Sequence, residues 1–116
     1  MLTLSPAVRI YVATGATDLR RSIDGLVGLV REQFQLDPLS GHWFVFRNRR
    51  GDRVKLLAWD QSGFWVCYKR LEQGTFAWPA DETATPVTMR SGDLLLLLAG
   101  VDLAHTRRRR WYERVA

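Results

Sequence analysis

The stretch that decides the fold runs from His42 to Pro79 and reads HWFVFRNRRGDRVKLLAWDQSGFWVCYKRLEQGTFAWP. Apolar and polar side chains alternate along it with a period of two, which is the pattern of β-strands with one buried face. Short segments containing glycine interrupt the alternation, and such segments join neighbouring strands as hairpins. The pattern predicts an antiparallel meander with strands at 43–46, 54–59, 64–71 and 75–78.

Before this stretch, the sequence predicts one short strand and one long helix. The strand is Val8–Val12, and the helix runs from Thr17, its expected N-cap, to Leu36. Apolar residues recur in the helix at a spacing that places them within an arc of about 100°. These residues are Leu19, Ile23, Leu26, Val27, Val30 and Phe34.

After the meander, a polar loop at 80–86 leads to a short helix, which Ser91 caps and which ends at Leu98 before Gly100. Residues 94–98 are all leucine, so this helix is either buried on most sides or turned in part towards a partner chain. The candidate protein interface consists of Leu94, Leu95, Leu97 and Leu98. The expected fold is α+β, a four- or five-stranded antiparallel meander with one long amphipathic helix packed on it and a short C-terminal helix.

Length and composition indicate one folded domain. The 116 residues are 47% hydrophobic and 25% charged, as in an ordinary globular protein with a single core. We expect the domain to occupy residues 1–103, followed by a basic tail at 104–116. Cys67 is the only cysteine, which excludes an intrachain disulfide and fits a reducing cytoplasm. Because there is no signal-peptide pattern and no apolar run long enough to span a bilayer, we expect a soluble cytoplasmic protein.

The charge of the chain indicates an acidic partner. Lys and Arg number 17 against 12 Asp and Glu, which gives a net charge of +5, and every basic residue except Lys55 and Lys69 is arginine. The planar guanidinium of arginine fits phosphate, carboxylate or an aromatic ring. Nucleic acid is the commonest partner of such a chain, although a basic surface can also be merely solvated.

Basic side chains and tryptophans come together on the predicted meander. Alternation places Lys55 and Trp59 on one face of their strand, and Trp65 and Lys69 on one face of the next. This mixture suits a sugar–phosphate backbone with exposed bases, but it also suits a protein partner, or a core of tryptophans with solvated arginines. The candidate DNA-binding residues are Arg47, Arg49, Arg50, Arg53, Lys55, Trp59, Trp65, Lys69 and Arg70, with Arg107, Arg108, Arg109 and Arg110 in the tail.

The sequence predicts no catalytic site. Its carboxylates are scattered over predicted turns and do not converge as a two-metal nuclease requires. His42 and His105 are far apart along the chain, and neither belongs to a pattern of metal ligands. Since no phosphate-binding glycine motif occurs either, we expect a protein that is not an enzyme and holds no cofactor or metal.

Four segments resemble, in order, the motifs of a known family. The matching segments are Thr17–Leu26 (family TDMRKSxDGL), Phe44–Leu57, Lys69–Pro79 (family KRLExGxFxWP) and Leu97–Asp102 (family LLxGID). The family is the Orf2-like accessory protein, called TnpB, of the sixty-six class of bacterial insertion sequences.

The resemblance implies a role in DNA transposition beside a separate transposase that carries the acidic catalytic triad. We therefore expect a non-catalytic accessory protein. Its expected partners are element DNA, or the transposase and other proteins of the same insertion sequence, or both DNA and proteins. The alternative is a pure protein–protein adaptor of the transposase without DNA contact. Whether the chain forms a homo-oligomer stays open at this point.

Overall fold

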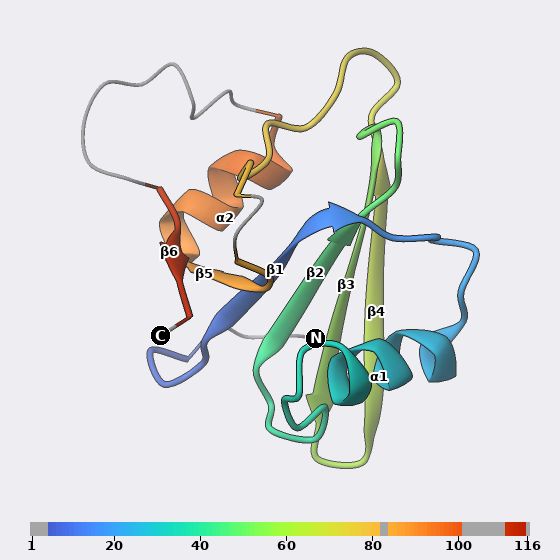
Figure 1. Ribbon diagram of the computed structural model, residues 1–116, viewed down its shortest axis with the longest axis vertical. Helices are drawn as coiled ribbons and strands as arrows, with labels where there is room; N and C mark the ends of the chain where they lie inside the picture. Colours follow the sequence, from blue (N-terminus) through green and yellow to red (C-terminus); the bar gives the residue numbers. More distant parts are fainter. Residues whose placement is uncertain (1–4, 82–83, 101–110, 116) are drawn as a thin grey trace.

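The computed structural model describes residues 5–81, 84–100 and 111–115, which form a mixed β-sheet with one helix on each face (Figure 1). Within these ranges the sheet has six strands, in the order β4-β3-β2-β1-β5-β6. The strands are β1 (Ile10–Ala16), β2 (Trp43–Arg47), β3 (Arg53–Asp60), β4 (Gly63–Arg70), β5 (Val87–Met89) and β6 (Glu113–Arg114). The helices are α1 (Ile23–Glu32) and α2 (Ser91–Leu98). The α+β class is confirmed, whereas the predicted number of strands was too low.

The sheet is mixed and not antiparallel throughout. β2, β3 and β4 form the predicted antiparallel meander. β1 is parallel to β2, because the chain passes through α1 between these strands and returns to the same end of the sheet. On its other side β1 pairs antiparallel with β5, which pairs with β6.

The fourth strand predicted for the meander, at 75–78, is wrong. The backbone N–H of Phe76 donates to the carbonyl oxygen of Gly51 (2.8 Å), and the indole N–H of Trp78 donates to that of Ala13 (2.7 Å). Aromatic residues alternate here because an irregular segment inserts them into the core. Strands β5 and β6 were not predicted, because they have three and two residues, which are too few for a periodic pattern.

Helix α1 is shorter at both ends than predicted. It begins after Ser22, its N-cap, and ends before Gln33, its C-cap, so Thr17 is not the N-cap. The carboxylate of Asp18 instead accepts a hydrogen bond from the backbone N–H of Arg20 (3.0 Å). Such local bonds of aspartate compete with helix formation, so the segment before Ser22 is a loop.

The core has two halves because neighbouring residues of each strand point to opposite faces. Phe44 packs with α1 on one face, and Val45 packs with α2 on the other. The sequence predicted the long helix packed on the meander and did not assign the short helix to the opposite face. Leu94 and Leu97 of α2 have exposed fractions of 0%, so they are core residues and not the protein interface that we expected. Neither described helix has the length and apolar composition to cross a membrane.

The imidazole of His42 holds the start of the parallel strands β1 and β2 together. From this contact we expect the stability of the protein to depend on pH. Nδ1 of His42 accepts a hydrogen bond from the backbone N–H of Arg9 (2.9 Å). Burial, and then the charge of Arg9, lower the pKa of His42 below its usual value. The unfolded chain therefore binds a proton at a higher pH than the folded chain, so the stability from this contact is present above about pH 6.5 and is lost as the pH falls towards the folded pKa.

Urea unfolding at pH 7.5 and pH 5 checks this expectation. The His42→Asn variant retains a side-chain acceptor but does not titrate, so its loss of unfolding free energy between these pH values should be smaller than that of wild type. Equal losses in both proteins would contradict the assignment to His42.

Candidate nucleic-acid interface

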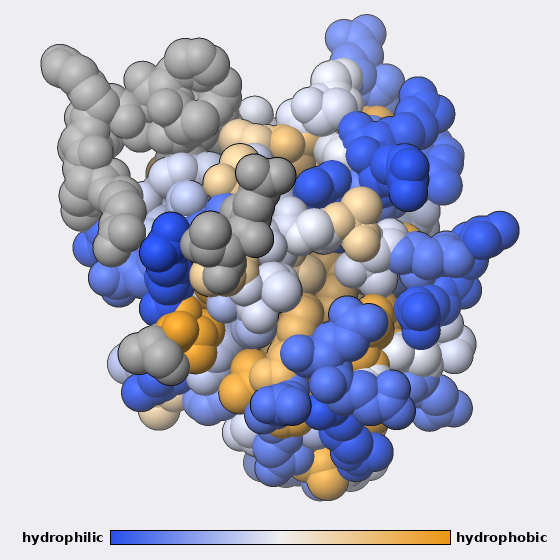
Figure 2. All heavy atoms as spheres, in the orientation of Figure 1, coloured by the Kyte–Doolittle hydropathy of each residue, from blue (hydrophilic) through white to orange (hydrophobic). Residues whose placement is uncertain are grey.

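An open groove of about 610 Å³ lies on the α1 face of the sheet. β3 and β4 form its floor, while the loop before α1 and the turn between β2 and β3 form its walls. Figure 2 shows hydrophilic side chains gathered over these two segments, at the upper right of the view. The charged residues that line the groove are Arg20, Arg49, Arg50, Arg53, Lys55 and Asp18. Its lining is therefore strongly cationic.

The turn between β2 and β3 is held by the side chain of Asn48. Its amide oxygen accepts a hydrogen bond from the backbone N–H of Arg53 (3.0 Å), and its amide N–H donates to Oδ1 of Asp52 (2.7 Å). Gly51 has φ +76°, a conformation that favours glycine. This framework fixes the backbone of the turn and leaves Arg49 and Arg50 exposed at its tip.

The carboxylate of Asp52 offsets only part of the positive charge at this turn, because it stands against three arginines. The hydrogen bond from Asn48 lowers the pKa of Asp52, and the charges of Arg50 and Arg53 lower it further. Within the described ranges, Arg49, Arg50 and Arg53 form no ion pair. Three guanidinium groups of one turn can therefore meet an external anion.

The other wall of the groove carries an ion pair. Asp18 accepts hydrogen bonds from Nε and Nη2 of Arg20, each at 2.9 Å. The hydrogen bonds from Arg20 lower the pKa of Asp18 to about 2, so this carboxylate is charged at neutral pH. Because the pair is exposed it adds little stability, but it holds the guanidinium of Arg20 at the rim.

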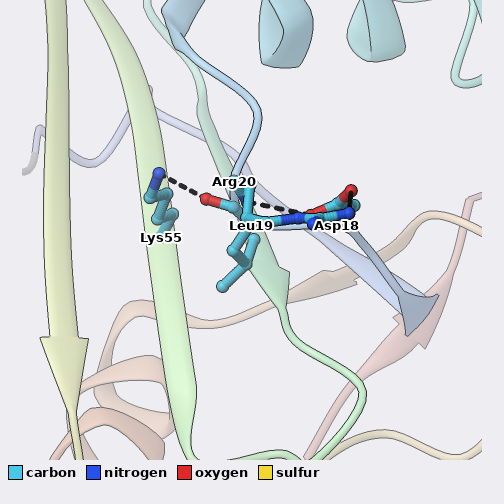
Figure 3. Close-up of polar contacts among 4 residues, drawn as sticks. All are labelled: Asp18, Leu19, Arg20 and Lys55. Carbon is cyan, nitrogen blue, oxygen red and sulfur yellow. Dashed lines mark hydrogen bonds and ion pairs between the residues drawn. The ribbon is translucent and has the colours of Figure 1, made fainter.

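The ammonium group of Lys55 positions this wall. Its Nζ donates to the carbonyl oxygen of Leu19 (2.6 Å) and to that of Arg21 (3.3 Å), as Figure 3 shows for Leu19. The same Nζ lies 5.4 Å from the centre of the Tyr68 ring. Lys55 is therefore engaged with the protein itself, and we assign it to positioning the loop before α1 in place of the phosphate contact that we expected.

Lys69 and Trp65 lie on the opposite face of the sheet from the groove. They alternate with Tyr68 along β4 and pair with residues of the α2 half of the core. Nζ of Lys69 donates to the carbonyl oxygen of Leu98 (2.7 Å), where a cation is favourable at the C-terminus of α2. The indole N–H of Trp65 donates to Asp60 (3.1 Å). These two residues therefore do not line the groove.

Arg47 and Trp59 are also separate from the groove. The guanidinium of Arg47 donates to the carbonyl oxygens of Thr14 and Asn48, each at 3.3 Å. Trp59 packs edge-to-face on Phe64, with 5.1 Å between the ring centres, at the other end of β3. Both side chains therefore serve the internal packing of the sheet.

Arg70 is the remaining candidate on the meander. It pairs with Arg53 across β3 and β4, so its side chain lies on the groove side, where its Nε forms an ion pair with Glu72 (2.9 Å). The tail arginines at 107–110 lie outside the described residues. Of the predicted DNA-binding residues, the structure thus brings together Arg49, Arg50 and Arg53, with Arg70 on the neighbouring strand.

Sequence reasoning missed two groove residues, Arg20 and Tyr68. Arg20 falls within the helix that was predicted for residues 17–36, and it was not among the candidate site residues. Tyr68 is 56% exposed. It could have been found from the sequence, because a two-residue turn at 61–62 fixes the register of the two strands that it joins and places Tyr68 opposite Lys55. The groove therefore offers an aromatic ring beside its cations.

The described ranges contain no group of three or more His, Cys, Asp or Glu side chains arranged to hold a metal ion. That the chain is not an enzyme stays a prediction.

Comparison with known proteins gives a family match over most of the chain. Residues 8–108 match the family model described as "IS66 Orf2 like protein". The uncharacterized protein y4hO of Sinorhizobium fredii is 38% identical over 105 residues, which cover 90% of each chain. The uncharacterized protein y4jC of the same organism is 38% identical over 109 residues, 94% of this chain and 92% of the relative. No solved structure matches this chain. The matched region includes all the residues that line the groove.

Proposed function

This chain belongs to the IS66 Orf2-like family, as its sequence motifs predicted, and we propose that it is a non-catalytic accessory protein of transposition that binds the DNA of its insertion sequence. Family membership supports the association with an insertion sequence and its transposition machinery. The contact with DNA, through the basic groove, is our inference. We place the protein in the bacterial cytoplasm, where the single thiol of Cys67 stays reduced.

The observation that supports DNA binding is that four guanidinium groups converge on one groove, three of which form no ion pair within the described ranges. Arg49, Arg50 and Arg53 come from a single rigid turn, while Arg20 faces them from the loop before α1. A groove whose lining carries five cations and one carboxylate has a net positive field, which attracts the opposite charge. The sugar–phosphate backbone is the extended polyanion that such a groove fits best.

The groove would hold DNA through its backbone and not through its bases. Each guanidinium can donate two parallel hydrogen bonds to phosphate oxygens. The exposed ring of Tyr68 can pack on a sugar or on an unstacked base. Contacts of this kind fix the position of a protein on DNA but do not select a sequence, so strand cleavage and site choice belong to the transposase.

Fluorescence anisotropy with labelled element-end DNA over a salt series tests this proposal. If Arg20, Arg49, Arg50 and Arg53 each neutralise one phosphate, the logarithm of the binding constant should fall with that of salt concentration with a slope of about −3 to −4. Absence of binding even at about 50 mM salt would overturn the proposal. In the same samples, Mg²⁺ or Mn²⁺ should produce no nicking of the DNA.

A pure adaptor of the transposase is the second candidate function. It is favoured by two exposed leucines of α2, Leu95 (62% exposed) and Leu96 (44% exposed), since exposed apolar side chains often mark protein interfaces. Capture of the transposase by the tagged protein, before and after nuclease treatment, separates the two functions. A complex that survives nuclease treatment, together with no binding to DNA alone, would favour the adaptor.

A further inference from the structure

Among the described residues, β4 is a long edge strand of the sheet. Within the ranges 5–81, 84–100 and 111–115 it pairs with β3 alone, whereas the opposite edge, β6, has two residues. The backbone N–H of Leu71 donates to the carbonyl oxygen of Asp52 (2.8 Å), which fixes the hydrogen-bonding alternation along the β3–β4 ladder. The backbone groups of the even-numbered residues 64–70 therefore point away from β3. A long row of such groups is a template for another strand.

The side chains of β4 differ between its two ends. Phe64 and Trp65 lie at the start of the strand, and Lys69 and Arg70 lie at its end. Trp65 is 43% exposed, and the thiol of Cys67, halfway between Trp65 and Lys69, is also exposed. A strand with an aromatic end and a cationic end is complementary to an antiparallel copy of itself, because cations pack favourably on aromatic rings.

We propose that two copies of this chain pair antiparallel through β4, about a twofold axis at Cys67. In antiparallel strands, directly opposed residues point to the same face of the sheet. An axis between two consecutive residues would oppose residues that point to different faces, so the twofold axis of a pair of identical strands must pass at a residue. With Cys67 at the centre, Trp65 lies opposite the partner's Lys69, and Phe64 lies opposite the partner's Arg70. The row of outward-facing backbone groups on each copy meets that of the other.

The cationic end of β4 does not oppose this pairing. Lysine and arginine on an edge strand usually prevent association by repulsion. In the antiparallel arrangement Lys69 and Arg70 of one copy face the aromatic end of the other and not the same two cations. If the axis passed at Val66, Gly63 would lie opposite the partner's Lys69, and the contact of that lysine with the ring of Trp65 would be lost. Cys67 is therefore the favoured centre.

The pairing would also bring two grooves together. This consequence rests on the proposed function, whereas the pairing itself does not. A twofold axis perpendicular to the sheet leaves both α1 faces on the same side. Tyr68 and Arg53 line the groove close to the β4 edge, so the two grooves would lie beside each other across the axis. One DNA backbone could then contact both copies.

Two substitutions of opposite charge at one exposed position test the pairing by sedimentation equilibrium without DNA. Wild type should be a dimer. Trp65→Lys places like charges opposite each other on both sides of the axis, and it should weaken dimerisation roughly tenfold or more. Trp65→Glu removes the same ring but places a carboxylate opposite the partner's Lys69, so the dimer should persist. Circular dichroism establishes that both variants are folded.

Oxidation of the single cysteine tests the register. Directly opposed residues that do not exchange hydrogen bonds have Cα atoms about 4.5 Å apart, which is within the range of a disulfide. Copper–phenanthroline with oxygen should therefore join two chains through Cys67, and Cys67→Ser should abolish the product. A monomeric wild type at hundreds of micromolar, equal dimerisation of the two Trp65 variants, or a dimer that forms no disulfide would each overturn the proposal. None of these outcomes depends on DNA binding.

Discussion

The Leu97→Ala variant is expected to unfold with a free energy lower than that of wild type by about 2–5 kcal/mol. The side chain of Leu97 has an exposed fraction of 0% and packs, with Leu94, in the half of the core that lies between α2 and the sheet. Truncation removes buried methyl groups and leaves a cavity that a close-packed core fills only in part. For a chain of this size a loss of that magnitude is a large part of the total stability.

Leu95→Ala is the matched control on the same helix. Leu95 is 62% exposed, and the same substitution at such a position should change the unfolding free energy by no more than about 0.5 kcal/mol. Both variants are measured by urea unfolding monitored through tryptophan fluorescence. Equal effects at the two positions would contradict the orientation of α2. A loss of transposase capture by Leu95→Ala, at unchanged stability, would favour the adaptor function.

The parts of the fold that the sequence predicted correctly depend on neighbours along the chain. The three hairpin-linked strands alternate with a period of two and are joined by short turns, so each is specified by its own residues. The parallel pairing of β1 with β2, and the pairing of β1 with β5, join segments that are distant in the sequence. The failed strand at 75–78 shows the limit of periodicity, because aromatic side chains that insert into a core from an irregular segment give the same pattern as a strand.

The same distinction holds for the groove. Arg49, Arg50 and Arg53 were predicted together because one tight turn carries all three. The register of the turn at 61–62 already places Tyr68, and not Lys69, on the same face as Lys55. The sequence did not show that Lys55 and Lys69 donate to the carbonyl oxygens of Leu19 and Leu98 respectively. Those acceptors belong to segments far along the chain, and a charged residue gives no local sign that a distant carbonyl will bind it.

The Arg49→Ala/Arg50→Ala variant is expected to bind element DNA about a hundredfold more weakly than wild type. Both side chains are exposed at the tip of the turn, and each lost charge-assisted bond to phosphate removes roughly tenfold in affinity. The slope of the logarithm of the binding constant against that of salt concentration should become shallower by about 2, one for each lost phosphate contact. Stability should change little, because the turn is held by Asn48 and not by these two arginines.

The Arg9→Ala/Arg31→Ala variant removes the same net charge from exposed positions that do not line the groove. Long-range attraction falls equally in the two variants, whereas direct phosphate contacts are lost only in the first. Anisotropy at one salt concentration near 0.1 M, where the screening length is about 10 Å, should show a much smaller loss for the control. If the two variants bind DNA equally, net charge alone explains the binding and the groove is not the site. A large difference between them would locate the DNA at the turn between β2 and β3.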